Sequence, residues 1–205
     1  MDQQTVNYYS ENAQAVAARY ESVVSSLSKS FEDVFKACSK LLDIGCGSGR
    51  DLAFLAKLGH DCFGIDATPE FVELSQKLHP ELKGKIAHCA LPNFDLPFGG
   101  EFDGILCSAV LMHIPEDQLV PAALSIKSCL KKSGQLLYSV PCKRLDLVTE
   151  NRDANGRLFI PDQSDRLQII FEQLGFILTS KWVTVDSMGR DSVEWISVLM
   201  ELAGD

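Results

Sequence analysis

Three glycines at alternate positions lie between a short apolar run and a stretch with helical spacing. They are Gly45, Gly47 and Gly49, and the run before them is Lys40–Ile44. Glycine allows a tight turn and lets a ligand approach the backbone, because it has no Cβ. Amide groups at the start of the following helix attract a phosphate or a carboxylate. The stretch therefore predicts a ligand-binding loop.

Two acidic residues accompany this loop. Asp43 lies two residues before Gly45, and Asp66 ends the next apolar run, 21 residues after Gly45. An acid at the end of the second strand can bind both hydroxyls of a ribose. Asp43 would repel a pyrophosphate but could accept hydrogen bonds from an α-ammonium group. The acids therefore predict a ribose-bearing cofactor, and the G-x-G-x-G spacing disfavours a dinucleotide, whose usual loop is G-x-G-x-x-G.

Apolar runs alternate with helical stretches from residue 40 onward, which predicts strands joined by crossover helices. The predicted strands are Lys40–Ile44, Cys62–Asp66, Lys85–Ala90, Phe102–Cys107, Gln135–Val140, Phe176–Val185 and Val193–Leu202. The predicted helices are Asp51–Leu58, Pro69–Leu78, Leu119–Leu130, which Lys131, Lys132 and Gly134 would end, and one that Ser164 would cap. This order positions the glycine loop and Asp66 at the ends of two strands.

The last two predicted strands are joined by only seven residues, 186–192. A connection this short suits an antiparallel pair, because a parallel crossover needs about a dozen residues or more. We therefore expect an α/β fold with a mostly parallel seven-stranded sheet, an antiparallel C-terminal hairpin at its edge, and helices on both faces.

Residues 1–39 lack the alternation of a strand. Apolar residues recur there at three- and four-residue steps, which predicts one or two amphipathic helices. They are Ala13, Val16, Ala17, Tyr20, Val23, Val24 and Leu27. We therefore expect an N-terminal helical cap over residues 1–39 and the cofactor-binding domain over residues 40–205.

Composition narrows the function classes. The 205 residues include 19 Lys and Arg and 28 Asp and Glu, a net charge of −9 that disfavours a basic nucleic-acid face. The seven cysteines stand singly, without the close-set pairs of a zinc site, so we expect no bound metal and a reducing compartment. No signal-peptide pattern and no apolar run near ~20 residues is present. We expect a soluble, cytoplasmic monomer or homodimer with no membrane partner.

The glycine loop and its acids resemble a known family. Asp43-Ile44-Gly45-Cys46-Gly47-Ser48-Gly49 is similar to the first motif of the class I S-adenosylmethionine-dependent methyltransferases, D-x-G-x-G-x-G after the first strand. The resemblance covers residues 40–140 closely and implies a Rossmann-like fold with S-adenosylmethionine as cofactor. It also implies that the methionine moiety is held by Asp43 and the backbone of Gly45, Cys46, Gly47 and Gly49, the ribose by Asp66, and the adenine along Ala67.

The resemblance extends less completely to later segments. The family often has an acidic residue near the adenine after the third strand, but Ile86–Leu91 contains no acid, so we expect Ala90, with Leu91 beside it, to take that place. Cys107–Pro115 resembles the stretch after the fourth strand in the small-molecule branch, which implies that Ser108 lies beside the methyl group. Related enzymes fold the N-terminal segment over the cofactor, so Tyr20 is either a cofactor contact or an ordinary helix-packing residue.

His113 is the candidate general base. Its ordinary pKa of about 6.5 suits removal of a proton from an acceptor at neutral pH. Such a base is needed only when the acceptor is protonated, because the cofactor itself supplies the electrophile. The competing interpretation, which we favour, is that His113 packs near the loop or caps the next helix.

Several cations gather late in the chain. Lys143, Arg144, Arg152 and Arg157 surround a turn in an otherwise acidic half, and Arg190 lies in the final hairpin. Arginines there would suit a lid that recognises an anionic substrate. A solvated loop with local ion pairs is the simpler interpretation.

Together the motifs predict an S-adenosylmethionine-dependent methyltransferase that acts on O, N, S or C of a small molecule and releases S-adenosylhomocysteine. Ser108–Leu111 stands where amino-methylating nucleic-acid enzymes carry Asn/Asp-Pro-Pro-Tyr/Phe, which disfavours that chemistry. Three alternatives stay open: a protein that binds the cofactor without catalysis, a protein methyltransferase, and a nicotinamide-dependent oxidoreductase, which the loop spacing disfavours.

Overall fold

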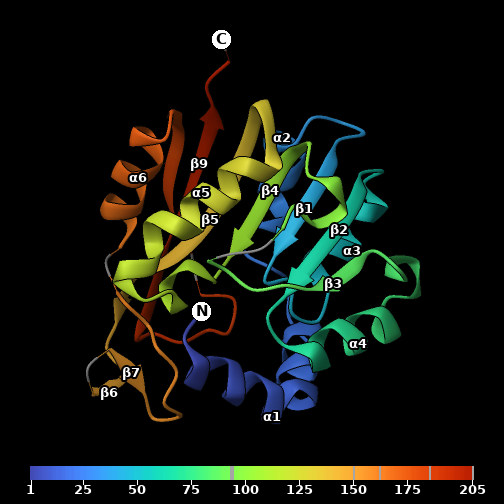
Figure 1. Cartoon of the computed structure of the whole chain (residues 1–205). Coiled ribbons are helices and arrows are strands. Elements are labelled where there is room, and N and C mark those ends of the chain that lie inside the picture. Colours follow the sequence, from blue (N-terminus) through green and yellow to red (C-terminus); the bar gives the residue numbers. More distant parts are fainter. Residues whose placement is uncertain (93–94, 150, 162, 185, 205) are drawn as a thin grey trace.

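A seven-stranded sheet forms the centre of the molecule (Figure 1). The computed structural model describes residues 1–92, 95–149, 151–161, 163–184 and 186–204. The sheet has the order β3-β2-β1-β4-β5-β9-β8. Its strands are β1 (Lys40–Ile44), β2 (Asp61–Asp66), β3 (Ile86–His88), β4 (Phe102–Ser108), β5 (Leu130–Arg144), β8 (Phe176–Thr184) and β9 (Val193–Leu202). β1 to β5 pair in parallel, so the predicted fold class is confirmed.

The C-terminal hairpin joins the sheet through its second strand. β9 lies between β5 and β8 and is antiparallel to both, and β8 forms the edge. β8 therefore runs in the same direction as β5. As a consequence, the loop 186–192 between β8 and β9 emerges at the same edge of the sheet as the glycine loop.

Helices cover both faces of the sheet. They are α1 (Gln3–Glu21), α2 (Phe31–Val34), α3 (Arg50–Lys57), α4 (Pro69–Leu78), α5 (Leu119–Cys129) and α6 (Ser164–Gln173), with 3₁₀ turns η1 (Ser28–Ser30), η2 (Pro80–Leu82), η3 (Pro97–Gly99), η4 (Leu111–His113) and η5 (Glu116–Gln118). Neighbouring side chains of a strand point to opposite faces. Accordingly, Leu42 packs in one core with α5 and α6, and Leu41 packs in another with α2 and α3.

The helix α1 packs against α4 and lies near the edge where β1 and β2 end (Figure 1). Ala13, Val16 and Ala17 of α1 meet Phe71 of α4 in a small core of their own. The N-terminus of α1 is capped by Asp2, whose side chain accepts a hydrogen bond from the amide of Thr5 at 2.9 Å. Asp2 also pairs with Arg152 at 2.8 Å. Arg152 belongs to the two-stranded sheet of β6 (Leu147–Thr149) and β7 (Arg152–Asp153), so α1 is tied to that sheet.

The end of α5 differs from the prediction. The helix ends at Cys129, and Leu130 is already extended and pairs with Phe102. Residues 131–134 bulge opposite Asp103, and Lys131 pairs with that carboxylate at 2.6 Å. The predicted helix end at Lys131, Lys132 and Gly134 was therefore wrong, because a bulged extension of β5 competes with the helix for this stretch.

Other element ends also shift. β3 is shorter than the predicted Lys85–Ala90, and β5 is longer than Gln135–Val140. The apolar spacing at the N-terminus continues past the end of α1, and Val24 is 77% exposed. The N-cap of α6 is Gln163 in place of Ser164. Val185, the predicted end of β8, lies outside the described residues.

The strand order reverses between β1 and β4, which both run in the same direction. Crossover connections leave this point in opposite directions, so a crevice opens beyond the carboxyl ends of the two strands. The glycine loop follows β1, and Ser108 ends β4. No helix among the described residues is long and apolar enough to cross a membrane.

Candidate cofactor and acceptor site

A cavity of about 560 Å³ lies at this crevice. Of the predicted site residues, it is lined by Tyr20, Asp43, Gly45, Cys46, Gly47, Asp66, Ala67, Ser108 and His113. The structure thus gathers side chains from α1, β1, β2, β4 and η4 around one space. Their convergence depends on the parallel sheet, which places the ends of its strands at one edge.

The glycine loop forms the floor of the cavity. Gly45 and Gly47 have φ of +73° and +55°, a backbone region that favours glycine. The amides of Gly45 and Cys46 both donate to the carbonyl of Ile65, at 2.8 and 3.1 Å, which fixes the loop to β2. A Cβ on Gly47 would stand 3.7 Å from the ring of Tyr20. The loop therefore leaves space that a side chain would fill.

Asp66 is held in place by the loop itself. Its carboxylate accepts hydrogen bonds from the amides of Gly47 and Thr68, each at 2.9 Å, and its exposed fraction is 7%. Burial raises the pKa of Asp66, and the two amide bonds oppose that rise. The carboxylate thus borders the cavity in a fixed orientation, with acceptor capacity left for a ligand.

Asp43 is a buried carboxyl in the wall of the cavity. Its exposed fraction is 3%, and no described group donates a hydrogen bond to it. Burial raises the pKa of Asp43 well above its ordinary value, and the nearby carboxylates of Asp51 and Asp66 raise it further. A cation in the cavity would relieve this unfavourable environment, because an ammonium group offers both charge and donors.

Tyr20 reaches the loop from the end of α1. Its ring lies over Gly47, and its backbone carbonyl accepts a hydrogen bond from Nη1 of Arg50 at 3.1 Å. Burial raises the pKa of the Tyr20 hydroxyl. Tyr20 therefore both packs in the cap and faces the cavity, so the two interpretations of this residue are compatible.

Gly49, Ala90 and Leu91 do not line the cavity in the described structure. Gly49 is the N-cap of α3, and a Cβ there would face Ser75 and Leu82 at 3.2 Å. Leu91 is 2% exposed in the core of the sheet, because β3 ends at His88 and the chain then turns inward. Thr68 and Phe71 line the cavity beside Ala67 instead.

The loop after β4 forms another wall of the cavity. The amide of Ala109 donates to the carbonyl and to Oγ of Ser139, both at 3.1 Å, and the hydroxyls of Ser108 and Ser139 lie 3.2 Å apart. Ala109 has a φ of +58°, and Val110 packs against Gly45. This wall links the end of β4, and Ser139 of β5 beside it, to the glycine loop.

His113 is buried and held by both of its ring nitrogens. Nδ1 donates to the carbonyl of Leu158 at 2.5 Å, so Nε2 is the acceptor, and the hydroxyl of Tyr9 lies 3.4 Å from it. The ring also meets Phe159 edge-on at 4.7 Å between centroids. Burial lowers the pKa of His113 to about 4, so the ring is neutral at neutral pH. These contacts favour the packing interpretation, and a catalytic role stays a prediction.

We expect the His113→Phe variant to lose a pH dependence of stability that the parent chain shows. The unfolded state binds a proton near the ordinary pKa of 6.5, and the folded state does so only near a pKa of about 4. The contribution of neutral His113 is therefore fully present above 6.5 and falls by about 3 kcal/mol as the pH drops toward 4. Denaturant titrations of both proteins across this window measure the difference. A parallel pH profile in the two would contradict the buried, neutral ring.

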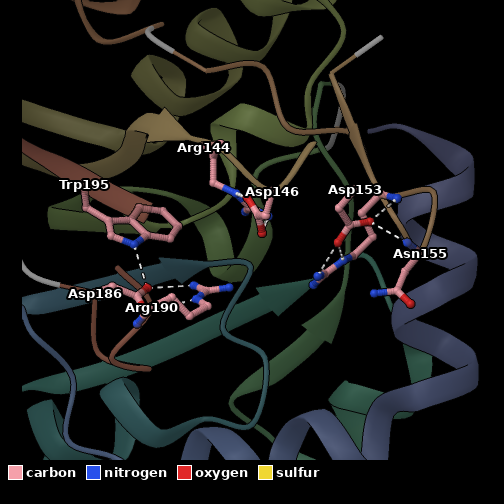
Figure 2. A network of polar contacts seen from close by, with 8 residues as sticks. Arg144, Asp146, Asp153, Asn155, Asp186, Arg190 and Trp195 are labelled. Carbon is pink, nitrogen blue, oxygen red and sulfur yellow. Dashed lines mark hydrogen bonds and ion pairs between the residues drawn. The ribbon is translucent and has the colours of Figure 1, made fainter. Parts of the chain in front are cut away.

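The far end of the cavity contains Arg144 and Arg190, two of the cations for which the sequence left open an anion-recognising lid or a solvated loop. It is bordered by Met112, Arg144, Phe159, Asp186, Arg190 and Trp195. Figure 2 shows the polar contacts of this region, in which Trp195 Nε1 donates to Asp186 at 2.9 Å. From the sequence alone, Trp195 lies in the predicted strand Val193–Leu202 and is expected to pack the C-terminal hairpin. The sequence alone does not place this residue at the site. Loop 186–192 lies near the cavity because β8 runs in the same direction as β5, and that direction follows from the strand order.

The fold and the site define a class of protein. The chain belongs to the methyltransferase-domain family, whose model matches residues 9–181. This stretch contains the glycine loop, Asp66 and His113, and the resemblance seen in the sequence is confirmed.

Three known proteins illustrate the relationship. The chain is 34% identical over 113 residues to the mitochondrial ubiquinone biosynthesis O-methyltransferase of Schizosaccharomyces pombe, which covers 52% of this chain and 39% of that protein. The 1,6-didemethyltoxoflavin-N1-methyltransferase of Burkholderia thailandensis, solved with its acceptor and S-adenosylhomocysteine, has a TM-score of 0.75 at 17% identity over 98% of this chain and 88% of that one. A TehB-like methyltransferase from Corynebacterium glutamicum has a TM-score of 0.70 at 19% identity, over 93% and 97%. The two structures show a shared fold.

Proposed function

We propose that the chain is an S-adenosylmethionine-dependent methyltransferase that acts on a small molecule. The observation that carries the proposal is the buried carboxyl of Asp43, to which no described group donates a hydrogen bond, beside a glycine loop and with the oriented carboxylate of Asp66 in the same cavity. An amino-acid ammonium group suits Asp43, and a ribose diol suits Asp66. Tyr20 and Phe71 offer aromatic surface to the remainder of the cofactor.

The residues of the chain would align the acceptor with the cofactor and exclude water from the acceptor. The cofactor supplies an activated methyl group on a sulfonium when bound, so the chain's residues have to position the acceptor and strip its water. Ser108 at the end of β4 and Ser139 beside it on β5 place polar groups in the wall of the cavity. Cofactor and acceptor would thus meet between the two ends.

The small-molecule character of the acceptor is supported by the relatives. By their names, one matched protein is an O-methyltransferase of ubiquinone biosynthesis and another is an N1-methyltransferase of 1,6-didemethyltoxoflavin. The chain spans about two fifths of the length of the curated relatives it matches. Their substrate is therefore not assigned to this chain. A helical cap over residues 1–39, a cytoplasmic location and a monomeric or homodimeric state stay predictions, and one matched relative is mitochondrial by name.

Calorimetry with S-adenosylhomocysteine tests the proposal together with transfer of labelled methyl groups from S-adenosylmethionine to a pool of metabolites. We expect binding at one site per chain and label in a small molecule. Binding without label in any metabolite or protein would favour a non-catalytic module. Label in proteins alone would favour a protein methyltransferase. Tight binding of a nicotinamide dinucleotide and none of S-adenosylhomocysteine would overturn the proposal.

A further inference from the structure

Two arginines at the far end of the cavity are held in the same way. Arg144 donates from Nε and Nη2 to the two oxygens of Asp146, at 2.7 and 2.8 Å. Arg190 donates from Nε and Nη2 to the two oxygens of Asp186, at 3.0 and 2.7 Å. Each guanidinium is therefore fixed side-on by a carboxylate from its own loop, and its Nη1 side is turned away from that carboxylate.

The two ion pairs leave Nη1 of Arg144 and Nη1 of Arg190 unused. In the described part of the chain, no group accepts a hydrogen bond from Nη1 of Arg144 or of Arg190, and both residues line the cavity. Arg157 differs, because all three of its guanidinium nitrogens donate hydrogen bonds. Nε and Nη2 donate to Asp153, and Nη1 donates to the hydroxyl of Tyr9 at 3.3 Å. The contrast separates two arginines with unused donors from one that only supports the structure.

The two clusters lie within electrostatic reach of each other. The hydrogen bond to Asp186 raises the pKa of Arg190, burial opposes the rise, and the charge of Asp146 raises it further. Figure 2 draws the Trp195, Asp186 and Arg190 cluster next to the Arg144 and Asp146 pair. Loop 186–192 is also joined to the end of β5, since the amide of Leu145 donates to the carbonyl of Ser192 at 3.1 Å. Both arginines therefore line the cavity from segments that lie next to each other.

Asp186 does not repel an anion as strongly as its position suggests. Its oxygens accept four hydrogen bonds, from the amide, Nε and Nη2 of Arg190 and from Nε1 of Trp195. A carboxylate has about four lone-pair sites, so Asp186 has no acceptor capacity left. Burial alone would raise the pKa of Asp186, but these bonds lower it to about 2, and it stays the ionised partner of Arg190.

Apolar groups surround the arginines. The guanidinium of Arg144 stacks on the ring of Phe159 at 3.7 Å from its centroid. Met112 and Trp195 line the same end. The side chain of Arg144 is 1% exposed, whereas that of Arg190 is 38% exposed. This end of the cavity thus combines planar guanidinium donors with apolar walls. Such an arrangement suits a ligand with an oxyanion group on a flat or apolar skeleton.

We propose that the unused Nη1 sides of Arg144 and Arg190 bind a carboxylate of the methyl acceptor, so that this chain selects an apolar, preferably aromatic, acid as its substrate. The inference rests on the proposed function, because it assigns this end of the cavity to the acceptor. The paired carboxylates keep the arginines oriented before the ligand arrives, which lowers the cost of ordering them. The loop between β8 and β9 is then a specificity element.

The test uses the full chain saturated with S-adenosylhomocysteine, with benzoate and benzamide as probes of matched shape. We expect calorimetry to show benzoate binding at least about tenfold more tightly than benzamide. The Arg190→Gln variant should lose this preference. Because Arg190→Gln leaves Asp186 without its ion-pair partner, the Asp186→Asn/Arg190→Gln double variant serves as a second test and should lose the preference too. Arg166→Gln is the matched control, since Arg166 pairs with Glu116 at the surface and should keep it.

The outcomes separate the inference from the proposed function. S-adenosylhomocysteine should bind the parent chain and all three variants equally. Equal affinity for the two probes, binding of neither, or a benzoate preference that survives both Arg190 variants overturns the inference while leaving the proposed function standing. Weakened S-adenosylhomocysteine binding in the Arg190 variants would assign the arginine to the cofactor and also overturn it. A parent chain that does not bind S-adenosylhomocysteine would overturn the proposed function itself.

Discussion

We expect the Asp66→Ala variant to bind S-adenosylhomocysteine at least about tenfold more weakly than the parent chain, a loss of about 1.4 kcal/mol or more. The carboxylate would lose its bonds to the ribose, and hydrogen bonds to a charged group each contribute about 1.5–3 kcal/mol. The substitution also leaves the amides of Gly47 and Thr68 without their acceptor. The glycine loop would then lose part of its orientation. Calorimetric titration measures the change.

Asp61 offers a matched control on the same strand. It starts β2, whereas Asp66 ends it, and its exposed side chain pairs with Lys85 at 2.8 Å. Exposed ion pairs contribute little, so Asp61→Ala should keep the affinity of the parent chain. We expect Asp43→Ala to weaken binding by a similar factor to Asp66→Ala. Unchanged affinity in both Asp43→Ala and Asp66→Ala would refute the assigned cofactor site.

We expect the Gly45→Ala variant to lose more than about tenfold in S-adenosylhomocysteine affinity and to be less stable than the parent chain. A residue with a Cβ at φ +73° is strained by about 1–2 kcal/mol. In addition, the new methyl group would overlap Cγ2 of Val110. Either Val110 or the loop has to move, and both line the cavity.

The variant Gly59→Ala separates strain from overlap. Gly59 has a φ of +91°, but no atom stands within 4 Å of a Cβ there. It follows α3 and does not line the cavity in the described structure. Gly59→Ala should therefore show the backbone strain alone, with unchanged affinity. Denaturant titration and calorimetry of both variants make the comparison. Equal behaviour of the two would mean that the contact between Gly45 and Val110 does not shape the site.

Local patterns predicted much of the frame. The bounds of β1, α4 and β9 agree with the sequence, because each depends on neighbouring residues: a run of apolar side chains in the two strands and a proline in the first turn of the helix. The end of α5 was missed for the opposite reason. Lys131 and Gly134 have the features of a helix end, but the pairing of Leu130 with Phe102 draws the stretch into β5.

The site shows the same division. Asp43, Gly45 and Asp66 could be placed from spacing, because the glycine loop and the strand ends are local structures repeated on every sheet of this type. Leu91 is buried and does not line the cavity in the described structure, because β3 ends at His88 and Leu91 packs in the core of the sheet. The sequence of residues 86–91 does not indicate where β3 stops pairing with β2.

By itself, the sequence determined the parallel α/β architecture, the glycine loop and the two acids beside it. Only the tertiary structure decided that His113 is a neutral ring between Tyr9 and Leu158, and that Arg190 shares a cavity with Asp43. The physical reason is the distance along the chain between the residues that interact. Strand and helix patterns depend on residues a few positions apart, whereas burial, pKa and the direction of a side chain depend on segments that meet only after folding.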